Sequence, residues 1–146
     1  MTATIKQAYQ QIFNDEPVLF FSPGRINIIG EHTDYNGGFV LPAAIDKGIY
    51  LAVNKRTDTT IELYAASFNE SYSCTTQTVA KANKQWPNYI LGVVNELQQA
   101  GYEIGGFNLV MDGDLPIGAG LSSSAAVECA TIFALNDLFA LNISKQ

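Results

Sequence analysis

The sequence is poor in the residues that build metal centres and disulfide frameworks. Its 146 residues include two cysteines, Cys74 and Cys129, which form no Cys-x-x-Cys pair. This excludes a disulfide scaffold, a zinc knuckle and a thioredoxin-like site. The one histidine, His32, excludes a two-histidine metal site within the sequence. It also restricts any nucleophile–histidine scheme to that residue.

Basic residues and long apolar runs are also scarce. Eight Lys and Arg stand against fourteen Asp and Glu, a net charge of −6, which argues against nucleic-acid and anionic-membrane partners. An anionic ligand stays open, because one Arg and a helix N-terminus can hold a phosphate. No apolar run approaches membrane-spanning length, and the N-terminus lacks a signal-peptide core. We therefore expect a soluble, cytoplasmic protein.

No repeat, low-complexity stretch or linker divides the sequence. At 47% apolar and 15% charged residues, a chain of this length can bury a core. We therefore predict one domain, residues 1–146.

Hydrophobic periodicity predicts a mixture of helices and strands. We expect helices over 3–13 and 86–100, and a last helix that opens near Ser122–Ser124 and runs toward the chain end. Expected strands cover 18–21, 25–29, 48–55, 60–66 and 107–112, the first of them stopped by Ser22-Pro23-Gly24. Alternation in the middle strands predicts a sheet with one solvent face. Because strands and helices do not alternate strictly, the pattern indicates the α+β class.

Polar and charged residues are densest over residues 24–38. Glu31, His32 and Asp34 supply two carboxylates and an imidazole within four positions, and carboxylate oxygens readily accept hydrogen bonds from sugar hydroxyls. A tight solvated loop between strands has the same composition. From the residues alone, both interpretations stay open.

A second concentration of small and polar residues covers residues 115–126, Leu-Pro-Ile-Gly-Ala-Gly-Leu-Ser-Ser-Ser-Ala-Ala. Its glycines let the backbone approach a ligand, and the helix that follows offers free N–H groups to an anion. The alternative is a serine-capped helix after a glycine-rich turn. A Walker loop, a dinucleotide fingerprint and a nucleophile elbow are excluded by Leu121, Ser123 and Ser124 respectively.

Together these segments resemble the GHMP kinases, the group of galacto-, homoserine, mevalonate and phosphomevalonate kinases. The segment 23–38, Pro-Gly-Arg-Ile-Asn-Ile-Ile-Gly-Glu-His-Thr-Asp-Tyr-Asn-Gly-Gly, is similar to the galactokinase signature, which we expect over about residues 17–42. Residues 116–125 resemble the group's ATP-phosphate loop, expected over 115–126, and 86–92 resemble a galactokinase segment near the adenine.

The resemblance implies galactose 1-phosphorylation by ATP with Mg²⁺, the first committed step of galactose utilisation. Arg25 would stabilise charge at the transferred phosphoryl, and Ser124 would offer a hydroxyl to Mg²⁺. The residues implied in galactose binding are Glu31, His32, Thr33 and Asp34. Those implied in ATP binding are Trp86, Gly118, Ala119, Gly120, Leu121, Ser122, Ser123 and Ser124. The resemblance also implies a GHMP-kinase N-terminal domain, a mixed sheet with a left-handed β-α-β crossover.

One departure from the family concerns length, because its members are more than twice as long. Their catalytic base and second Mg²⁺ carboxylate follow the serine-rich helix. We therefore expect an N-terminal piece that lacks the C-terminal domain, is inactive alone and self-associates.

Other functions stay open. They are a related kinase for galacturonate or N-acetylgalactosamine, a non-catalytic galactose and ATP sensor, and an inert fragment. The intact Ser122–Ala126 segment favours an enzyme over a sensor.

Overall fold

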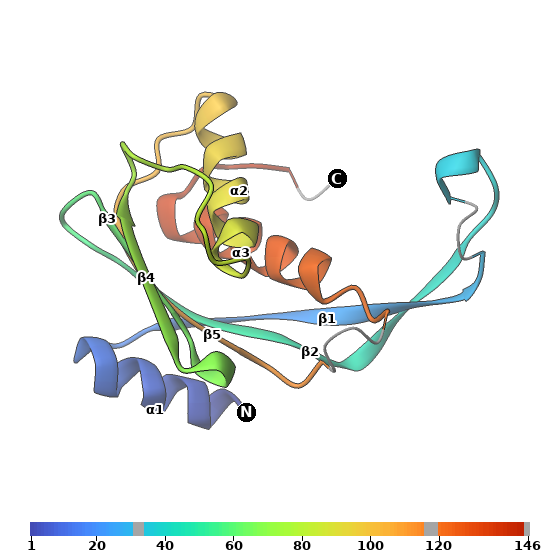
Figure 1. The fold of residues 1–146 in the computed structure, drawn as a ribbon, viewed down its shortest axis with the longest axis horizontal. Helices are drawn as coiled ribbons and strands as arrows, with labels where there is room; N and C mark the ends of the chain where they lie inside the picture. The colour runs from blue at the N-terminus through green and yellow to red at the C-terminus, as the bar shows by residue number, and fades with distance from the viewer. Residues whose placement is uncertain (31–33, 116–119, 145–146) are drawn as a thin grey trace.

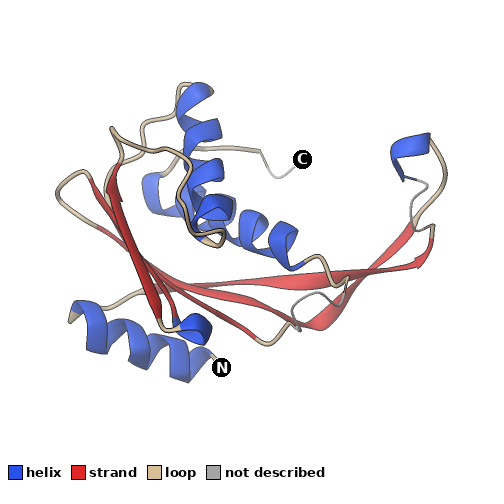
Figure 2. Cartoon of the chain, in the orientation of Figure 1, coloured by secondary structure: helices blue, strands red, loops and turns tan. Residues whose placement is uncertain are grey.

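The computed structural model describes residues 1–30, 34–115 and 120–144; of Asp34 it describes the backbone only. A five-stranded sheet separates one helix on one face from two helices on the other (Figures 1 and 2). In chain order the elements are α1 (Thr2–Phe13), β1 (Val18–Ile29), η1 (Asp34–Asn36), β2 (Leu41–Lys55), β3 (Thr60–Ala65), η2 (Ala66–Phe68), β4 (Glu70–Thr75), α2 (Pro87–Gln99), β5 (Phe107–Gly113) and α3 (Ser123–Phe139). The predicted α+β class is confirmed.

The sheet is mixed, with the strand order β1-β2-β5-β3-β4. The pairs β1–β2, β2–β5 and β3–β4 are antiparallel, whereas β3 and β5 run parallel. The parallel neighbours are connected through β4 and α2, as a parallel pair requires a crossover. The left-handed sense implied for a crossover of this domain stays a prediction.

The main core lies between the sheet and the helices α2 and α3. Alternate residues point to opposite faces of a strand, so each central strand sends every second side chain into this layer. These side chains are Leu51 and Val53 from β2, Ile61 and Leu63 from β3, and Leu109 and Met111 from β5. The helices cover them with apolar residues that include Ile90, Val94, Ala134 and Leu135.

A smaller core lies on the opposite face, under α1. Ile5 and Tyr9 are buried there against Ala52 of β2 and Val110 of β5. The prediction of one solvent face is therefore wrong for the centre of the sheet, because α1 covers it. Burial also raises the pKa of Tyr9 to about 12.

The prediction that Ser22-Pro23-Gly24 ends the first strand is wrong. β1 continues through this tripeptide, with an irregularity in its pairing to β2 between Pro23 and Arg25. Proline lacks the N–H that a central strand needs, but β1 is an edge strand with one unpaired side. Beyond the irregularity, Arg25 resumes pairing with β2, opposite Ala44.

Two other boundaries differ from expectation, and one strand was not predicted. β2 begins at Leu41 rather than Gly48, and β4 was not predicted. β4 alternates exposed serines with Tyr72 and Cys74, which pack on the main core, so its apolar signal is short. α3 ends at Phe139, where Ala140 adopts a left-handed conformation with φ of 51°. Such a residue ends a helix by turning the chain away from its axis.

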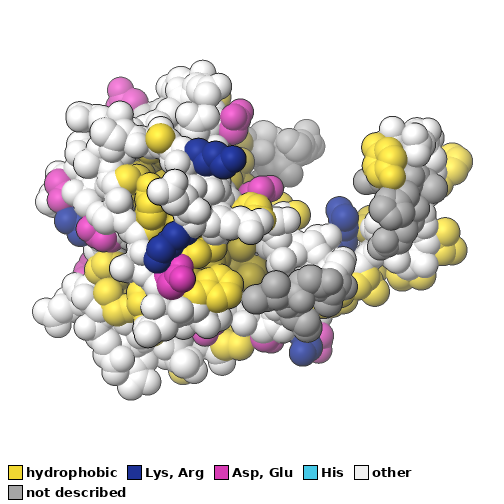
Figure 3. Space-filling model, viewed as in Figure 1, with side chains coloured by type: hydrophobic (Ala, Val, Ile, Leu, Met, Phe, Trp, Pro, Cys, Tyr) yellow, Lys and Arg dark blue, Asp and Glu magenta, His cyan; other side chains and the backbone are white. Residues whose placement is uncertain are grey.

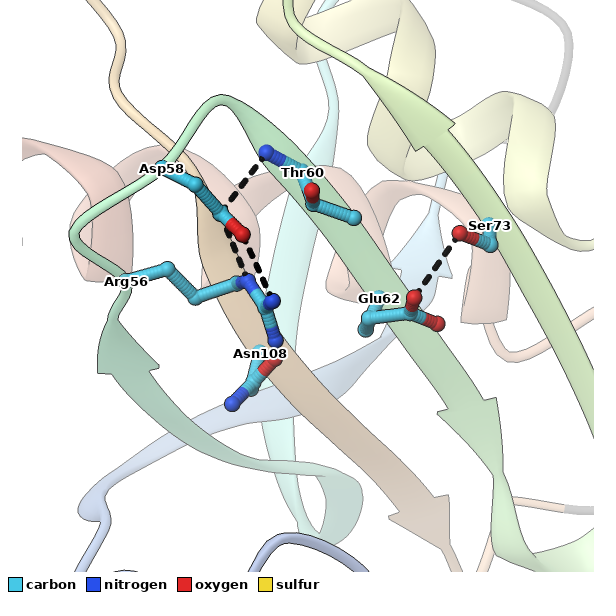
Figure 4. Close-up of polar contacts among 6 residues, drawn as sticks. All are labelled: Arg56, Asp58, Thr60, Glu62, Ser73 and Asn108. Atoms are coloured by element: carbon cyan, nitrogen blue, oxygen red, sulfur yellow. Dashed lines mark hydrogen bonds and ion pairs between the residues drawn. The ribbon is translucent and has the colours of Figure 1, made fainter.

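The turn between β2 and β3 is fastened to β5 by a polar network (Figure 4). The Arg56 guanidinium donates two hydrogen bonds of 2.8 Å to the Asp58 carboxylate and one of 2.9 Å to Asn108 Oδ1. The backbone N–H of Thr60 donates to Asp58 at 3.0 Å. The hydrogen bonds from Arg56 hold the pKa of the Asp58 carboxyl well below its usual range. This network stabilises the end of the sheet opposite the arm described next.

The ends of β1 and β2 extend beyond the body as an arm that carries η1 at its tip (Figure 1). Apolar side chains are exposed along it, and yellow surface is visible on the arm in Figure 3.

No helix in the described part of the chain is long and apolar enough to cross a membrane.

Candidate functional site

The two motif segments meet where β1 passes the chain that enters α3. The backbone N–H of Arg25 donates a hydrogen bond of 3.2 Å to the carbonyl oxygen of Leu121. Gly24 packs so closely that an added Cβ would lie 3.1 Å from that oxygen and 2.5 Å from Leu115 Cδ2. A glycine is needed here because any side chain would push the two segments apart.

The other end of the phosphate-loop segment is anchored on β2. The Gly48 N–H donates to Asp114 Oδ1 at 2.8 Å, and the Asp114 N–H donates to the Gly48 carbonyl at 3.3 Å. Gly48 pairs with Pro23 of β1. The segment from Asp114 to Leu121 therefore begins and ends on the same two-stranded ribbon. Sequence reasoning missed both anchors, because neither forms a recognisable motif.

The entry to α3 has an unusual backbone conformation. Gly120 has φ of 68° and Ser122 has φ of 55°. A left-handed serine costs energy relative to glycine, and such strain gathers at functional sites. Ser122 forms no side-chain cap, Ser123 begins the helix and Ser124 is exposed. The first turn of α3 can therefore present N–H groups and a hydroxyl to an anionic ligand.

Only part of the predicted sugar site falls within the described residues. Arg25 is exposed on β1, and Asp34 opens η1 at the tip of the arm. Glu31, His32 and Thr33, like Gly118 and Ala119 of the phosphate loop, lie outside the described residues. The structure thus brings Arg25 to the phosphate-loop segment and leaves the remaining sugar contacts as predictions.

Trp86 lies at the N-terminus of α2, where the residue is 8% exposed and belongs to the main core. Its indole N–H donates a hydrogen bond of 2.9 Å to Glu70 Oε2. The predicted contact of Trp86 with ATP is untested by this geometry. This contact of Glu70 was not predicted, since an isolated glutamate at the start of a short strand carries no signal.

The donor set for a metal is small. In the described ranges, no three His, Cys, Asp or Glu side chains gather into a cation site. The exposed Ser124 hydroxyl at the α3 entry is an oxygen donor of the kind that Mg²⁺ takes as a ligand.

Replacing Gly24 with alanine is expected to destabilise the contact between β1 and the phosphate-loop segment. Leu115 can shift, but the Leu121 carbonyl is backbone of the phosphate-loop segment and must move with it. We expect the free energy of unfolding to fall by about 1–3 kcal/mol, as in other overpacked sites. Urea unfolding measures this loss.

Gly92→Ala serves as the unfolding control, because an added Cβ at this α2 position meets nothing within 4 Å. It should leave stability unchanged or raise it. Equal free energies of unfolding in wild type and Gly24→Ala would contradict the close-contact argument.

Comparisons with known proteins agree with this geometry. Residues 7–55 match the family model for the galactokinase galactose-binding signature, and residues 88–146 match the GHMP kinases N terminal domain. The chain is 41% identical to a galactokinase of Roseiflexus sp. (strain RS-1), covering 97% of this chain and 37% of that protein. It is 45% identical to a galactokinase of Clostridium perfringens (strain 13 / Type A), covering 97% of this chain and 38% of the relative.

Among solved structures, Lactococcus lactis galactokinase complexed with galactose matches with a TM-score of 0.93 and 41% identity, over 98% of this chain and 38% of that one. The mevalonate kinase of Methanococcus jannaschii matches with a TM-score of 0.77 and 22% identity, over 88% of this chain and 42% of that one, which shows the shared fold. The chain spans less than two-fifths of the length of the two curated relatives. From its paired signatures and its fold, the chain belongs to the galactokinase family of GHMP kinases.

Proposed function

We propose that this chain forms the N-terminal domain, residues 1–146, of a galactokinase. The enzyme transfers the γ-phosphoryl group of ATP to the 1-hydroxyl oxygen of galactose, the hydroxyl proton passes to a base, and ADP leaves. The observation that carries the proposal is the hydrogen bond between Arg25 and Leu121, because it joins the signature strand to the phosphate-loop segment. A sugar kinase must hold both substrates at one place.

The proposed roles divide along this contact. On the sugar side, Glu31, His32, Thr33 and Asp34 would bind galactose hydroxyls, since carboxylates accept hydrogen bonds from them. On the nucleotide side, residues 118–124 and the first turn of α3 would receive the phosphates, with Trp86 nearer the adenine. Arg25, at the junction, would stabilise negative charge on the transferred group.

Mg²⁺ would arrive with ATP, and Ser124 would supply one hydroxyl ligand from the chain. When bound, the ion neutralises charge on the β- and γ-phosphates. An ATP-consuming kinase works where ATP is kept, so we also assign this protein to the cytoplasm.

Galactose-dependent release of ADP tests the proposal. The assay uses a protein of the relatives' full length that carries residues 1–146, with Mg·ATP and galactose, and identifies galactose 1-phosphate as the product. The kcat/KM for galactose is expected to exceed that for galacturonate or N-acetylgalactosamine by at least about tenfold, because a site shaped for specific hydroxyls rejects altered groups. Faster turnover of galacturonate or of N-acetylgalactosamine would identify that sugar as the substrate. Binding of galactose and ATP without turnover would indicate a sensor.

The isolated chain is proposed to self-associate through its arm. Phe39 is 99% exposed, and extended apolar patches promote association. The exposed large apolar residues of the arm are Ile26, Ile28, Ile29, Tyr35, Phe39, Val40 and Leu41.

A further inference from the structure

Glu70 connects β4 to the loop that leads into α2. Its Oε2 accepts the 2.9 Å hydrogen bond from the Trp86 indole N–H and lies 3.1 Å from the Lys84 ammonium. The Trp86 ring is buried, whereas the side chains of Glu70 and Lys84 are 41% and 47% exposed. One carboxylate oxygen at the surface therefore orients both a buried ring and a surface cation.

The same loop is closed on itself by Asn88, in the first turn of α2. The Asn88 amide donates to the carbonyl oxygens of Ala82 and Lys84 at 3.1 and 3.0 Å, and its Oδ1 accepts from the Ala82 N–H at 2.7 Å. Residues 82–88 thus form one hydrogen-bonded unit. Within the described ranges, the side-chain bonds that join Trp86 and Lys84 to β4 end on Glu70.

A groove of about 350 Å³ lies against this unit. One wall is Tyr72, two residues after Glu70 on β4, and another is Lys84 itself. Lys81 adds a second cation, so the groove favours a ligand that carries negative charge. The position of Lys84 at this wall depends on its ion pair with Glu70.

We propose that Glu70 is a positioning residue for the nucleotide side of the site, which fixes the buried Trp86 indole and the Lys84 ammonium of the groove wall before ATP binds. The proposal rests on the proposed kinase function. Glu70 does not touch the nucleotide; it lowers the cost of ordering the groups around it, because groups held in advance lose less freedom on binding. The Trp86 N–H and the Lys84 ammonium hold the pKa of Glu70 below its usual range, so the carboxylate stays charged at neutral pH.

Two substitutions separate positioning from simple structural support. Glu70→Ala removes the acceptor for Trp86 and the partner of Lys84, whereas Glu70→Gln keeps a carbonyl acceptor and removes only the charge. Glu62→Gln is the matched control. Glu62 also accepts one side-chain hydrogen bond, from Ser73 Oγ at 2.9 Å (Figure 4). It alternates with Ile61 and Leu63 of the main core and therefore lies on the opposite face of the sheet from Trp86.

The experiment uses a protein of the relatives' full length that carries this chain. We expect Glu70→Ala to raise the KM and the Kd for Mg·ATP about tenfold, the size of one hydrogen bond, with kcat and the galactose KM changed less than about twofold. The indole ¹⁵N–¹H resonance of Trp86, assigned with Trp86→Phe, should move in Glu70→Ala. Glu70→Gln should restore that resonance and most of the ATP affinity, and Glu62→Gln should match wild type.

Three outcomes would overturn the proposal while the wild type still binds Mg·ATP and phosphorylates galactose. They are an unchanged ATP affinity in Glu70→Ala, equal losses in Glu70→Ala and Glu70→Gln, or a parallel rise in the KM of both substrates. A wild-type protein that binds Mg·ATP without galactose turnover refutes only the proposed function, and the Kd series still tests Glu70. A wild type that does not bind Mg·ATP refutes both.

Discussion

Replacing Arg25 with alanine is expected to lower kcat for galactose phosphorylation by about 10²–10³-fold, the loss that follows removal of one preorganised charge-stabilising donor. Phosphoryl transfer depends on positioning and on stabilisation of charge that develops on the transferred group. The Arg25 side chain is exposed on β1, while its backbone N–H holds the Leu121 carbonyl. The substitution removes the guanidinium and keeps the backbone contact.

Steady-state kinetics distinguish this role from galactose binding. If Arg25 acts on the transition state, kcat and kcat/KM fall together while the galactose KM changes little. Arg25→Lys is the matched variant, because it keeps the positive charge and loses the planar, bidentate geometry of arginine. It should recover part of the lost rate. A near-normal kcat in Arg25→Ala would refute the electrostatic role.

Most secondary structure follows from local sequence, and the exceptions have tertiary causes. The pattern of residues 86–100 predicts α2 to within one residue at each end. The continuation of β1 through Pro23 is different, because it depends on the edge position of that strand. Strand order is set by pairings between distant segments, so the local pattern of residues 18–29 cannot predict that β1 lies at the edge of the sheet.

The second core shows the same limit for burial. Ala52 and Val110 alternate with larger core residues, as expected for the outer face of a sheet. They are buried because α1 returns across that face with Ile5 and Tyr9. The amphipathic pattern of α1 predicts a covered stripe, but it does not say which part of the sheet covers it.

The candidate site could also be predicted only in part. Its two motifs are recognisable in the sequence, because glycines, serines and carboxylates gather in two short segments. The contacts that assemble them are backbone contacts, from Arg25 to Leu121 and between Gly48 and Asp114. Backbone groups are common to every residue, so they leave no compositional signal. Glu70 makes its contacts through its side chain, but it lies on β4, a strand that was not predicted. Its partners Lys84 and Trp86 come only after the loop that follows this strand.

Replacing Asp34 with alanine is expected to raise the KM for galactose by about 10–150-fold. The substitution removes hydrogen bonds from sugar hydroxyls to a carboxylate, and a bond to a charged group contributes about 1.5–3 kcal/mol, where each 1.4 kcal/mol is tenfold in affinity. Asp34 opens η1 and is part of neither the phosphate-loop segment nor α3. The KM for ATP should therefore change by less than about threefold.

Asp46→Ala is the matched control for Asp34→Ala, because Asp46 is an exposed aspartate on β2, which forms the same arm. It removes the same charge without removing a signature residue, so a general effect of the acidic surface would appear in both variants. Asp34→Asn keeps one carbonyl acceptor and should lie between wild type and Asp34→Ala. If the KM for ATP rises and the KM for galactose does not, the arm serves the nucleotide. The sugar must then bind elsewhere, and the division of roles across the Arg25–Leu121 contact is wrong.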